Sequence, residues 1–341
     1  MTLIGLRALV GRAARAALVS ASLLVPATAG AQGQSFVRVT GSFEQLYDDN
    51  LFAAPLTAPQ QPGLISRFGP AVEAGYRSIP VKLVVRYGFD AERHITLPEL
   101  DEAIARQDAL VDFAHQTKRL TLTVGTSYQE TQAPRELNQQ SLLAVGRARA
   151  QRITARPGLV YELTALTKVK LDHNFSADAL AGGVSSATHV SRSGIDRRLD
   201  ARNVVRFDYR FRNVAFSDGL EERSHLATAG WTFEIAPSTS VEIDAGPRVT
   251  RGSGGVEPEV SLVLKHRLRQ GEFSFSYART LDTAIGESGT IDVHRLGTVV
   301  SFVPTRYFTL TASPAWVSSA RDVRRTVVHA LDLEGRVRAT R

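Results

Sequence analysis

The stretch Val81–Asp90, VKLVVRYGFD, decides the fold class of this chain. Its apolar residues stand at every second position: Val81, Leu83, Val85, Tyr87 and Phe89. The alternate positions carry Lys82, Arg86 and Asp90. Successive side chains of a β-strand point to opposite faces, so a strand gives this stretch one apolar and one polar face. A helix would scatter the same residues around its circumference, and the stretch therefore predicts a strand.

The same alternation recurs along most of the chain. Within 203–212, apolar residues alternate with Arg206, Asp208, Arg210 and Arg212. Further alternating stretches lie at 120–125, 152–162, 168–175, 231–235, 260–267, 272–277 and 331–336. The stretch 100–116 differs, because the residues of its first half favour a short helix, and we expect a strand only in its second half.

Two kinds of connection separate these strands. Short turns are expected near 77–80, 117–118, 164–166, 198–200, 236–239, 269–270 and 303–306. Longer loops are expected at 48–62, 92–104, 132–149, 179–187, 216–221, 252–255, 283–289 and 320–323. These seven turns and eight loops join sixteen strands, an even number as in bacterial outer-membrane barrels. Each strand has ample room for the roughly 9–11 residues that cross a membrane.

The first 31 residues have the features of a secretory signal peptide. Arg7, Arg12 and Arg15 precede the apolar run 16–25, which is too short for a stable membrane anchor. The small residues Ala29–Gly30–Ala31 match the pattern at which signal peptidases cut. We therefore predict a signal peptide at 1–31, cleavage after Ala31, and one domain at 32–341.

Composition and charge exclude several classes of protein. With 43% hydrophobic and 22% charged residues, wholesale disorder is not expected. The absence of cysteine excludes a disulfide scaffold and any site that needs a thiol. The net charge of +7 falls to +4 without the three signal-peptide arginines, since 38 basic residues then face 34 acidic ones. We therefore expect no nucleic-acid partner.

Alternation by itself fits both a soluble β-sandwich and a membrane barrel. In a barrel the apolar face meets lipid and the polar face lines the lumen. The signal peptide, and the separation of short turns from longer loops, favour the barrel. We predict an all-β chain that forms a transmembrane antiparallel β-barrel of about 16 strands. A periplasmic or secreted sandwich or β-solenoid is the alternative. The chain does not end in the aromatic residue that commonly closes such barrels and that the assembly machinery reads. Either this signal is a variant, or Leu331–Glu334 is the end of the last strand and a short tail follows it.

The element Tyr47–Asp48–Asp49–Asn50–Leu51–Phe52 closes the first predicted strand. A strand–turn–strand unit at 159–171 is echoed at 231–243. On these features the chain resembles a family of outer-membrane β-barrel porins whose genes often accompany genes for exopolysaccharide synthesis and export. The resemblance spans most of 32–341 and implies a barrel in the outer membrane of a Gram-negative type of cell.

The Tyr47–Phe52 element allows two interpretations. Its acidic centre could bind a cation or a sugar, or fold inward as a plug. Alternatively, it forms an Asx-type turn that ends the strand. Calcium needs six to eight oxygen ligands, which three consecutive side chains do not supply, so we predict no metal site.

The polar face of the predicted strands is rich in charged residues. The candidates for lumen charge are Lys82, Arg86, Arg152, Arg156, Arg206, Asp208, Arg210, Arg212, Lys265 and Arg267. Such a lumen would favour anions or acidic sugars. Alternatively, arginines and carboxylates on neighbouring strands pair and brace the barrel.

The sequence offers no catalytic constellation. The eight histidines are scattered, and neither an H-E-x-x-H nor a G-x-S-x-G motif occurs. We expect no catalytic residue and no cofactor, and hence no enzyme. The predicted function is a porin-like path for polar solutes or exported polysaccharide. A closed accessory barrel of an envelope polysaccharide assembly and, more remotely, an outer-membrane hydrolase are the alternatives. Expected partners are outer-membrane lipid, the barrel-assembly machinery, and polysaccharide or small anionic solutes, while the oligomeric state stays open.

Overall fold

The structure is a computed structural model that describes residues 33–48, 51–52, 59, 61–138, 146–251, 255–305, 308–321 and 324–337. The predicted signal peptide at 1–31 and its cleavage site lie outside the described residues, so both stay predictions.

Sixteen β-strands account for nearly all of the described chain. They are β1 (Gln34–Asp48), β2 (Gly63–Arg77), β3 (Val81–His94), β4 (Glu102–Gln116), β5 (Leu120–Thr131), β6 (Ala150–Thr164), β7 (Thr167–Leu180), β8 (Ser186–Arg198), β9 (Asn203–Phe216), β10 (Glu221–Ala236), β11 (Thr239–Thr250), β12 (Val256–Leu268), β13 (Gly271–Thr283), β14 (Thr290–Thr305), β15 (Phe308–Arg321) and β16 (Arg324–Val337). Two single-turn 3₁₀ helices, η2 (Pro98–Leu100) and η3 (Pro134–Glu136), lie in connections. No helix of the described residues is long and apolar enough to cross a membrane.

Each strand pairs with its neighbours in the sequence, and every pairing is antiparallel. All seven predicted turns and all eight predicted loops coincide with connections between strands. The prediction of an all-β chain with sixteen antiparallel strands is therefore confirmed. The reason is that period-two alternation is a local property of a strand, which the sequence displays without reference to distant partners.

The helix expected in the first half of 100–116 is wrong. Strand β4 runs from Glu102 to Gln116, and only Pro98–Leu100 forms a helical turn. Residues of β4 pair with β3 on one side and with β5 on the other. Pairing with two neighbouring strands overrides the weak helix preference of these residues.

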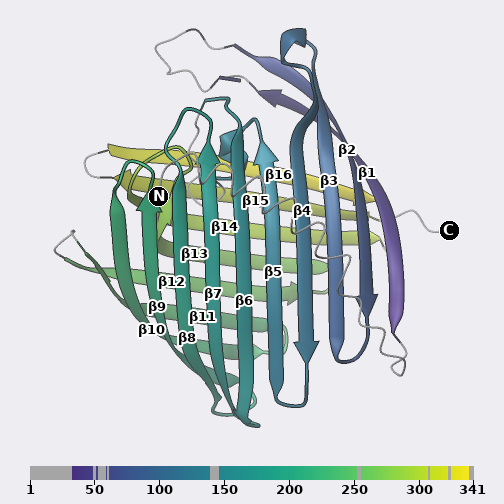
Figure 1. Ribbon diagram of the computed structural model, residues 1–341. Coiled ribbons are helices and arrows are strands. Elements are labelled where there is room, and N and C mark those ends of the chain that lie inside the picture. Colours follow the sequence, from purple (N-terminus) through teal and green to yellow (C-terminus); the bar gives the residue numbers. More distant parts are fainter. Residues whose placement is uncertain are drawn as a thin grey trace.

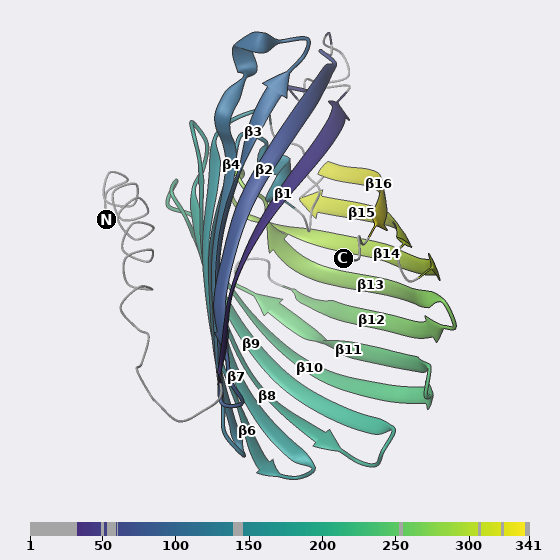
Figure 2. The same ribbon diagram turned by 90° about the vertical axis from the view of Figure 1, so that its right-hand side faces the viewer.

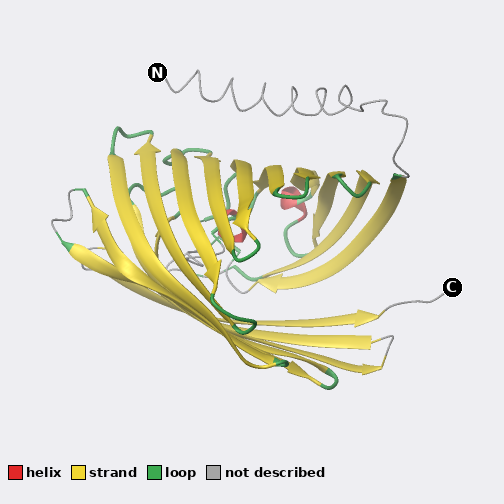
Figure 3. Cartoon of the chain, turned by 90° about the horizontal axis from the view of Figure 1, so that it is seen from below, coloured by secondary structure: helices red, strands yellow, loops and turns green. Residues whose placement is uncertain are grey.

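The sheet curls around a single interior. Figure 1 shows β1–β9 side by side, with the later strands crossing behind them. Figure 2 places β1 and β16 at the two margins of the sheet, and Figure 3 shows from below that these margins stand apart. Among the described strands, β1 pairs only with β2 and β16 only with β15.

The two faces of the sheet differ in chemistry. We call inner the face that carries the buried Arg67, Glu92 and Asp208, and outer the opposite face. Large apolar side chains are exposed on the outer face of strands from β1 to β16, as at Phe43 (70% exposed) and Leu331 (66% exposed). A soluble monomer rarely exposes so continuous an apolar surface.

The turn between β8 and β9 is fixed by one carboxylate. Asp200 Oδ1 accepts the backbone N–H groups of Arg202 (2.7 Å) and Asn203 (3.0 Å). These bonds, that from Arg202 foremost, together with the Asn203 side chain, lower the pKa of Asp200. A lowered folded-state pKa stabilises the turn above the ordinary pKa of about 3.9, and this contribution is lost as the pH falls.

We expect the amide proton of Arg202 to show an acid-induced NMR shift that reports this titration. Its midpoint should lie below the ordinary aspartate pKa of about 3.9. The Asp200→Asn variant, which cannot titrate, should show no such shift. A midpoint at or above the ordinary value in the wild type would contradict the role given to this carboxylate.

Candidate functional site

All ten residues predicted to supply lumen charge lie on the inner face. They come from β3 (Lys82, Arg86), β6 (Arg152, Arg156), β9 (Arg206, Asp208, Arg210, Arg212) and β12 (Lys265, Arg267). The strand periodicity that places buried Asp208 and Glu259 on this face places the others there too. Whether they act on a solute stays a prediction.

Most of the arginines in this set contact carboxylates. Arg152 donates two hydrogen bonds to Asp178, at 2.6 and 3.0 Å. The other ion pairs are Arg206–Asp244 (2.8 Å), Arg210–Glu259 (2.8 Å), Arg192–Asp208 (2.6 Å) and the looser Arg86–Asp108 (3.7 Å). Three of these pairs join neighbouring strands, whereas Arg206–Asp244 reaches from β9 to β11 and Arg210–Glu259 from β9 to β12.

The remaining members of the set lie elsewhere on the face. In the described part of the chain, no carboxylate lies within ion-pair distance of Lys82, Arg156, Arg212, Lys265 or Arg267. Asp112, Asp172, Glu234 and Glu272 share the inner face with them. The interior is therefore lined by charges of both signs, and it is not a uniformly cationic surface.

A buried charge network lies at the loop end of β2, β3 and β4. We call it the mouth network, and its members are Arg67, Asp90, Glu92, His94, Arg106, Glu136 and Arg147. Arg67 (6% exposed) lies between Glu92 at 2.6 Å and Glu136 at 2.7 Å. Arg147 reaches the same Glu92 (3% exposed) at 2.9 Å, and His94 Nε2 lies 3.4 Å from it. Buried charges of this kind are stable only when they are paired, as here.

The mouth network anchors a connection that folds into the interior. We call residues 132–138, which include η3, the mouth segment. Besides Glu136, it contributes Arg135, whose guanidinium lies 2.6 Å from Asp48 on β1. Arg106 on β4 also reaches Glu136, at 3.5 Å. Ion pairs thus hold the segment to β1, β2 and β4.

Apolar and backbone contacts also hold the mouth segment at the loop end of the sheet. Leu137 is buried with Ala150, Leu180 and Ile285, and its carbonyl accepts a hydrogen bond from Arg152 at 2.7 Å. The amide of Ile285, between β13 and β14, donates to Asn138 Oδ1 at 2.8 Å. A further bridge joins Val184 to Gly286. Three loops that are far apart in the sequence therefore meet at the loop end of the sheet.

The Tyr47–Phe52 element lies beside this closure. Tyr47 is exposed on the outer face, whereas Asp48 is buried and paired with Arg135. The buried Leu51 donates its amide to Gln61 O at 3.0 Å, and Phe52 is partly exposed. Asp49 and Asn50 lie outside the described residues, so neither the turn nor the binding interpretation is tested.

The outer face carries a second polar cluster near its loop end. Glu130 accepts hydrogen bonds from Gln107 (3.1 Å) and Gln151 (2.6 Å), and also from Tyr128 and Arg149. The hydrogen bond to Glu130 raises the pKa of Arg149, which lies in the connection before β6.

Among the described residues, no group of three or more histidine, aspartate or glutamate side chains is arranged to hold a metal ion.

Sequence patterns did not identify the mouth network. Arg67 and Glu92 stand at polar positions of alternating strands, like many other charged residues. Their partners Glu136 and Arg147 come from a loop that is more than 40 residues away in the sequence from both Arg67 and Glu92. Period-two alternation carries no information about such contacts, which only the folding of the loop creates.

Comparison with known proteins gives matches to solved structures but none to family models or curated sequences. The siderophore receptor PirA from Acinetobacter baumannii aligns with 91% of this chain and 59% of its own, at 10% identity and a TM-score of 0.46. A bacterial polysaccharide outer membrane secretin aligns with 90% of this chain and 98% of its own, at 11% identity and a TM-score of 0.44. The FrpB iron transporter from Neisseria meningitidis aligns with 84% of this chain and 61% of its own, at 9% identity and a TM-score of 0.44. The chain thus spans about three fifths of the length of PirA and of FrpB. None of these three similarities assigns a function to this chain.

Proposed function

We propose that the chain is an outer-membrane β-barrel that gives polar solutes or exported polysaccharide a path across the outer membrane of a Gram-negative type of cell. One observation carries the proposal: the outer face is apolar and exposed, whereas the inner face is lined with charge. An apolar outer face suits lipid, and a polar inner face suits hydrated solutes. The resemblance to porins encoded near exopolysaccharide genes agrees with it.

In this proposal the described conformation is a closed state. The mouth segment, held by Arg67, Asp48 and Arg106, lies across the loop end of the interior. A solute passes only when these ion pairs break and the segment moves aside. Conduction by the wild type is therefore expected to be intermittent.

The same contacts favour a second candidate function. Ion pairs brace the inner face from β3 to β12, and three loops meet over it. A barrel closed in this way permanently would act as an accessory scaffold of an envelope assembly. The two functions differ in whether the mouth segment can be released.

We expect the double variant Arg135→Ala/Glu136→Gln to conduct more often than the wild type in a planar bilayer. The change removes the ion pairs from Arg135 to Asp48 and from Glu136 to Arg67 and Arg106. A loss of about 1.4 kcal/mol of closing free energy shifts the closed-to-open ratio about tenfold. Single-channel recording of refolded residues 32–341 measures the open probability directly.

A matched control removes a charge from the outer face. Glu221→Gln breaks an exposed pair with Arg223 and should leave the open probability unchanged. If the wild type and Arg135→Ala/Glu136→Gln both refold as heat-modifiable barrels and neither conducts, the proposed solute path is contradicted. The scaffold function is then the one supported.

A further inference from the structure

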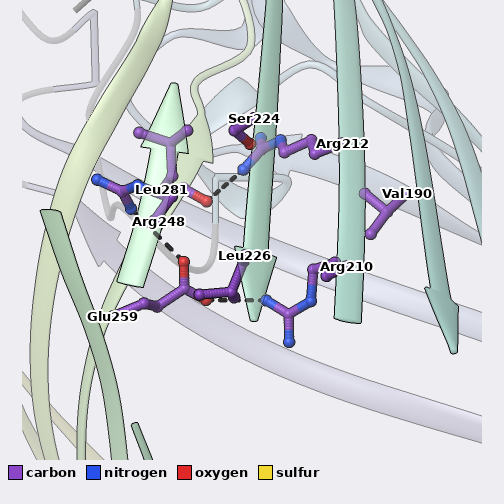
Figure 4. Close-up of a pocket in the computed structure, with 8 residues that line it drawn as sticks. All are labelled: Val190, Arg210, Arg212, Ser224, Leu226, Arg248, Glu259 and Leu281. Atoms are coloured by element: carbon purple, nitrogen blue, oxygen red, sulfur yellow. Dashed lines mark hydrogen bonds and ion pairs between the residues drawn. The ribbon is translucent and has the colours of Figure 1, made fainter. Parts of the chain in front are cut away.

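A cavity of about 120 Å³ lies on the inner face between β9, β10, β11, β12 and β13. Figure 4 shows the side chains that meet there. The residues that matter for its chemistry are Arg210, Arg212, Ser224, Arg248, Glu259 and Leu281. At about 30 Å³ per water molecule, the volume corresponds to a few waters or one small charged group.

Several N–H groups at this cavity have no acceptor in the described structure. Arg212 donates to the carbonyl oxygen of Leu281, and its Nε has no partner. Arg248 is 1% exposed and uses Nη2 to reach Asp292 at 2.5 Å and Glu257. Its Nε and Nη1 make no hydrogen bond. Buried N–H donors of this kind normally have a hydrogen-bond acceptor, so an acceptor on a bound group would fit this cavity.

The charges around the cavity are unevenly compensated. Glu259 is held by Arg210 at 2.8 Å and lies 3.5 Å from Arg248. Among the described residues, no carboxylate reaches Arg212 within ion-pair distance. A buried guanidinium whose one described acceptor is a backbone carbonyl is costly unless an anion joins it.

We propose that this cavity binds one oxyanion group, a carboxylate or a phosphate, carried on the solute or present as a free ion. The inference deepens the proposed function, because it assigns an anionic class of solute to one place on the path. Arg212 Nε and Arg248 Nε and Nη1 supply donors that match an oxyanion. The Arg210 side chain, which also lines the cavity, is 38% exposed.

The test is direct binding to the detergent-folded full chain, which needs no conduction. Isothermal titration calorimetry is run with glucuronate, inorganic phosphate and glucose as probes. We expect glucuronate or phosphate to bind and glucose not to bind. Glucuronate alone would identify the carboxylate of an acidic sugar, and phosphate alone would identify a phosphate group. Equal binding of glucose, or no binding of either anion, would overturn the proposal.

Substitutions at two neighbouring positions, Arg212 and Arg223, locate the site. Arg212→Met should weaken oxyanion binding at least about tenfold, because a charge-assisted donor pair is lost, and Arg212→Lys should retain part of it. Arg223→Met removes the same charge one row away on the outer face and should leave binding unchanged. If Arg223→Met weakens oxyanion binding as much as Arg212→Met does, the loss of affinity reflects the net charge of the protein. The proposed site at this cavity is then contradicted.

A stability measurement keeps the proposal testable if Arg212→Met folds poorly. The bound anion should raise the unfolding temperature of the wild type, because it binds only the folded state. Arg223→Met should show the same rise, and Arg212→Lys a smaller one. No rise in the wild type at saturating glucuronate and phosphate would overturn the proposal.

Discussion

Replacing Glu92 with glutamine is expected to lower the free energy of unfolding by about 3–5 kcal/mol, the usual cost of breaking a buried ion pair. The Glu92 carboxylate accepts from Arg67 at 2.6 Å and from Arg147 at 2.9 Å. All three side chains are largely buried. The amide of glutamine cannot neutralise two guanidiniums, so both would stay charged without their shared partner.

The measurement is urea unfolding of the chain refolded into lipid vesicles, followed by the fluorescence of Trp231 and Trp316. Glu162→Gln is the matched control, because it breaks an exposed pair with Lys168 at 2.7 Å. Exposed pairs contribute about 0–1 kcal/mol, so this control should unfold almost as the wild type does. Equal losses in the two variants would show that the mouth network is solvated and has no special part in stability.

A compensating variant separates lost charge from lost packing. In Arg67→Met/Glu92→Met/Arg147→Met these three charges are removed together and apolar side chains of comparable length take their place, while Glu136 keeps its ion pair with Arg106. Such replacements are often neutral or stabilising, so most of the loss seen in Glu92→Gln should be recovered. Recovery would show that the missing negative charge beside Arg67 and Arg147 causes the loss of stability.

The sequence predicted the strands and their faces because both are local. Within 81–91 of β3 and 205–211 of β9, every second side chain is apolar, and the exposed outer face follows from that alternation. The inner placement of Arg86 and Arg206 could be predicted for the same reason. Which carboxylate each arginine contacts depends on the register of the strands. Alternation does not fix this register, because a shift of two residues keeps every side chain on the same face.

Three features of the structure could not be predicted from this local alternation. The inward fold of residues 132–138 depends on contacts with Asp48, Arg67 and Ile285, which come from distant parts of the chain. Strand β4 was partly missed because its pairing with β3 and β5 outweighs a local helix preference. The cavity beside Arg212 is lined by β9 and β13, which are not neighbours in the sheet and which the hydrogen bond from Arg212 to the Leu281 carbonyl connects.

Pairing of β1 with β16 in the membrane is expected to have the largest effect on stability. In the described sheet these strands, of 15 and 14 residues, each have one neighbour only. An unsatisfied backbone group in lipid costs several kcal/mol, so two open edges could not persist there. With an even number of strands, β1 and β16 run in opposite directions and can close the barrel as an antiparallel pair.

The side chains favour one register for this closure. With Val39 opposite Leu333, both outer-face and exposed, Arg38 lies opposite Glu334 on the inner face. The same register sets Phe43 opposite His329. Phenylalanine already faces histidine on the outer face at Phe175–His189, Phe211–His225 and Phe273–His266. The first two of these pairs have ring centroids 4.9 and 5.0 Å apart.

Cysteine pairs test this register without background, because the chain contains no cysteine. Val39→Cys/Leu333→Cys should form a disulfide within one chain in vesicles, since directly opposed residues lie about 4.5–5.5 Å apart. Val39→Cys/Asp332→Cys places the second thiol on the other face, and Val39→Cys/Leu331→Cys shifts it by two residues. Both should crosslink far less. A crosslink that forms only between two chains would mean that the edges join separate molecules, and crosslinking that favours Leu331 would move the register by two residues while keeping the closure.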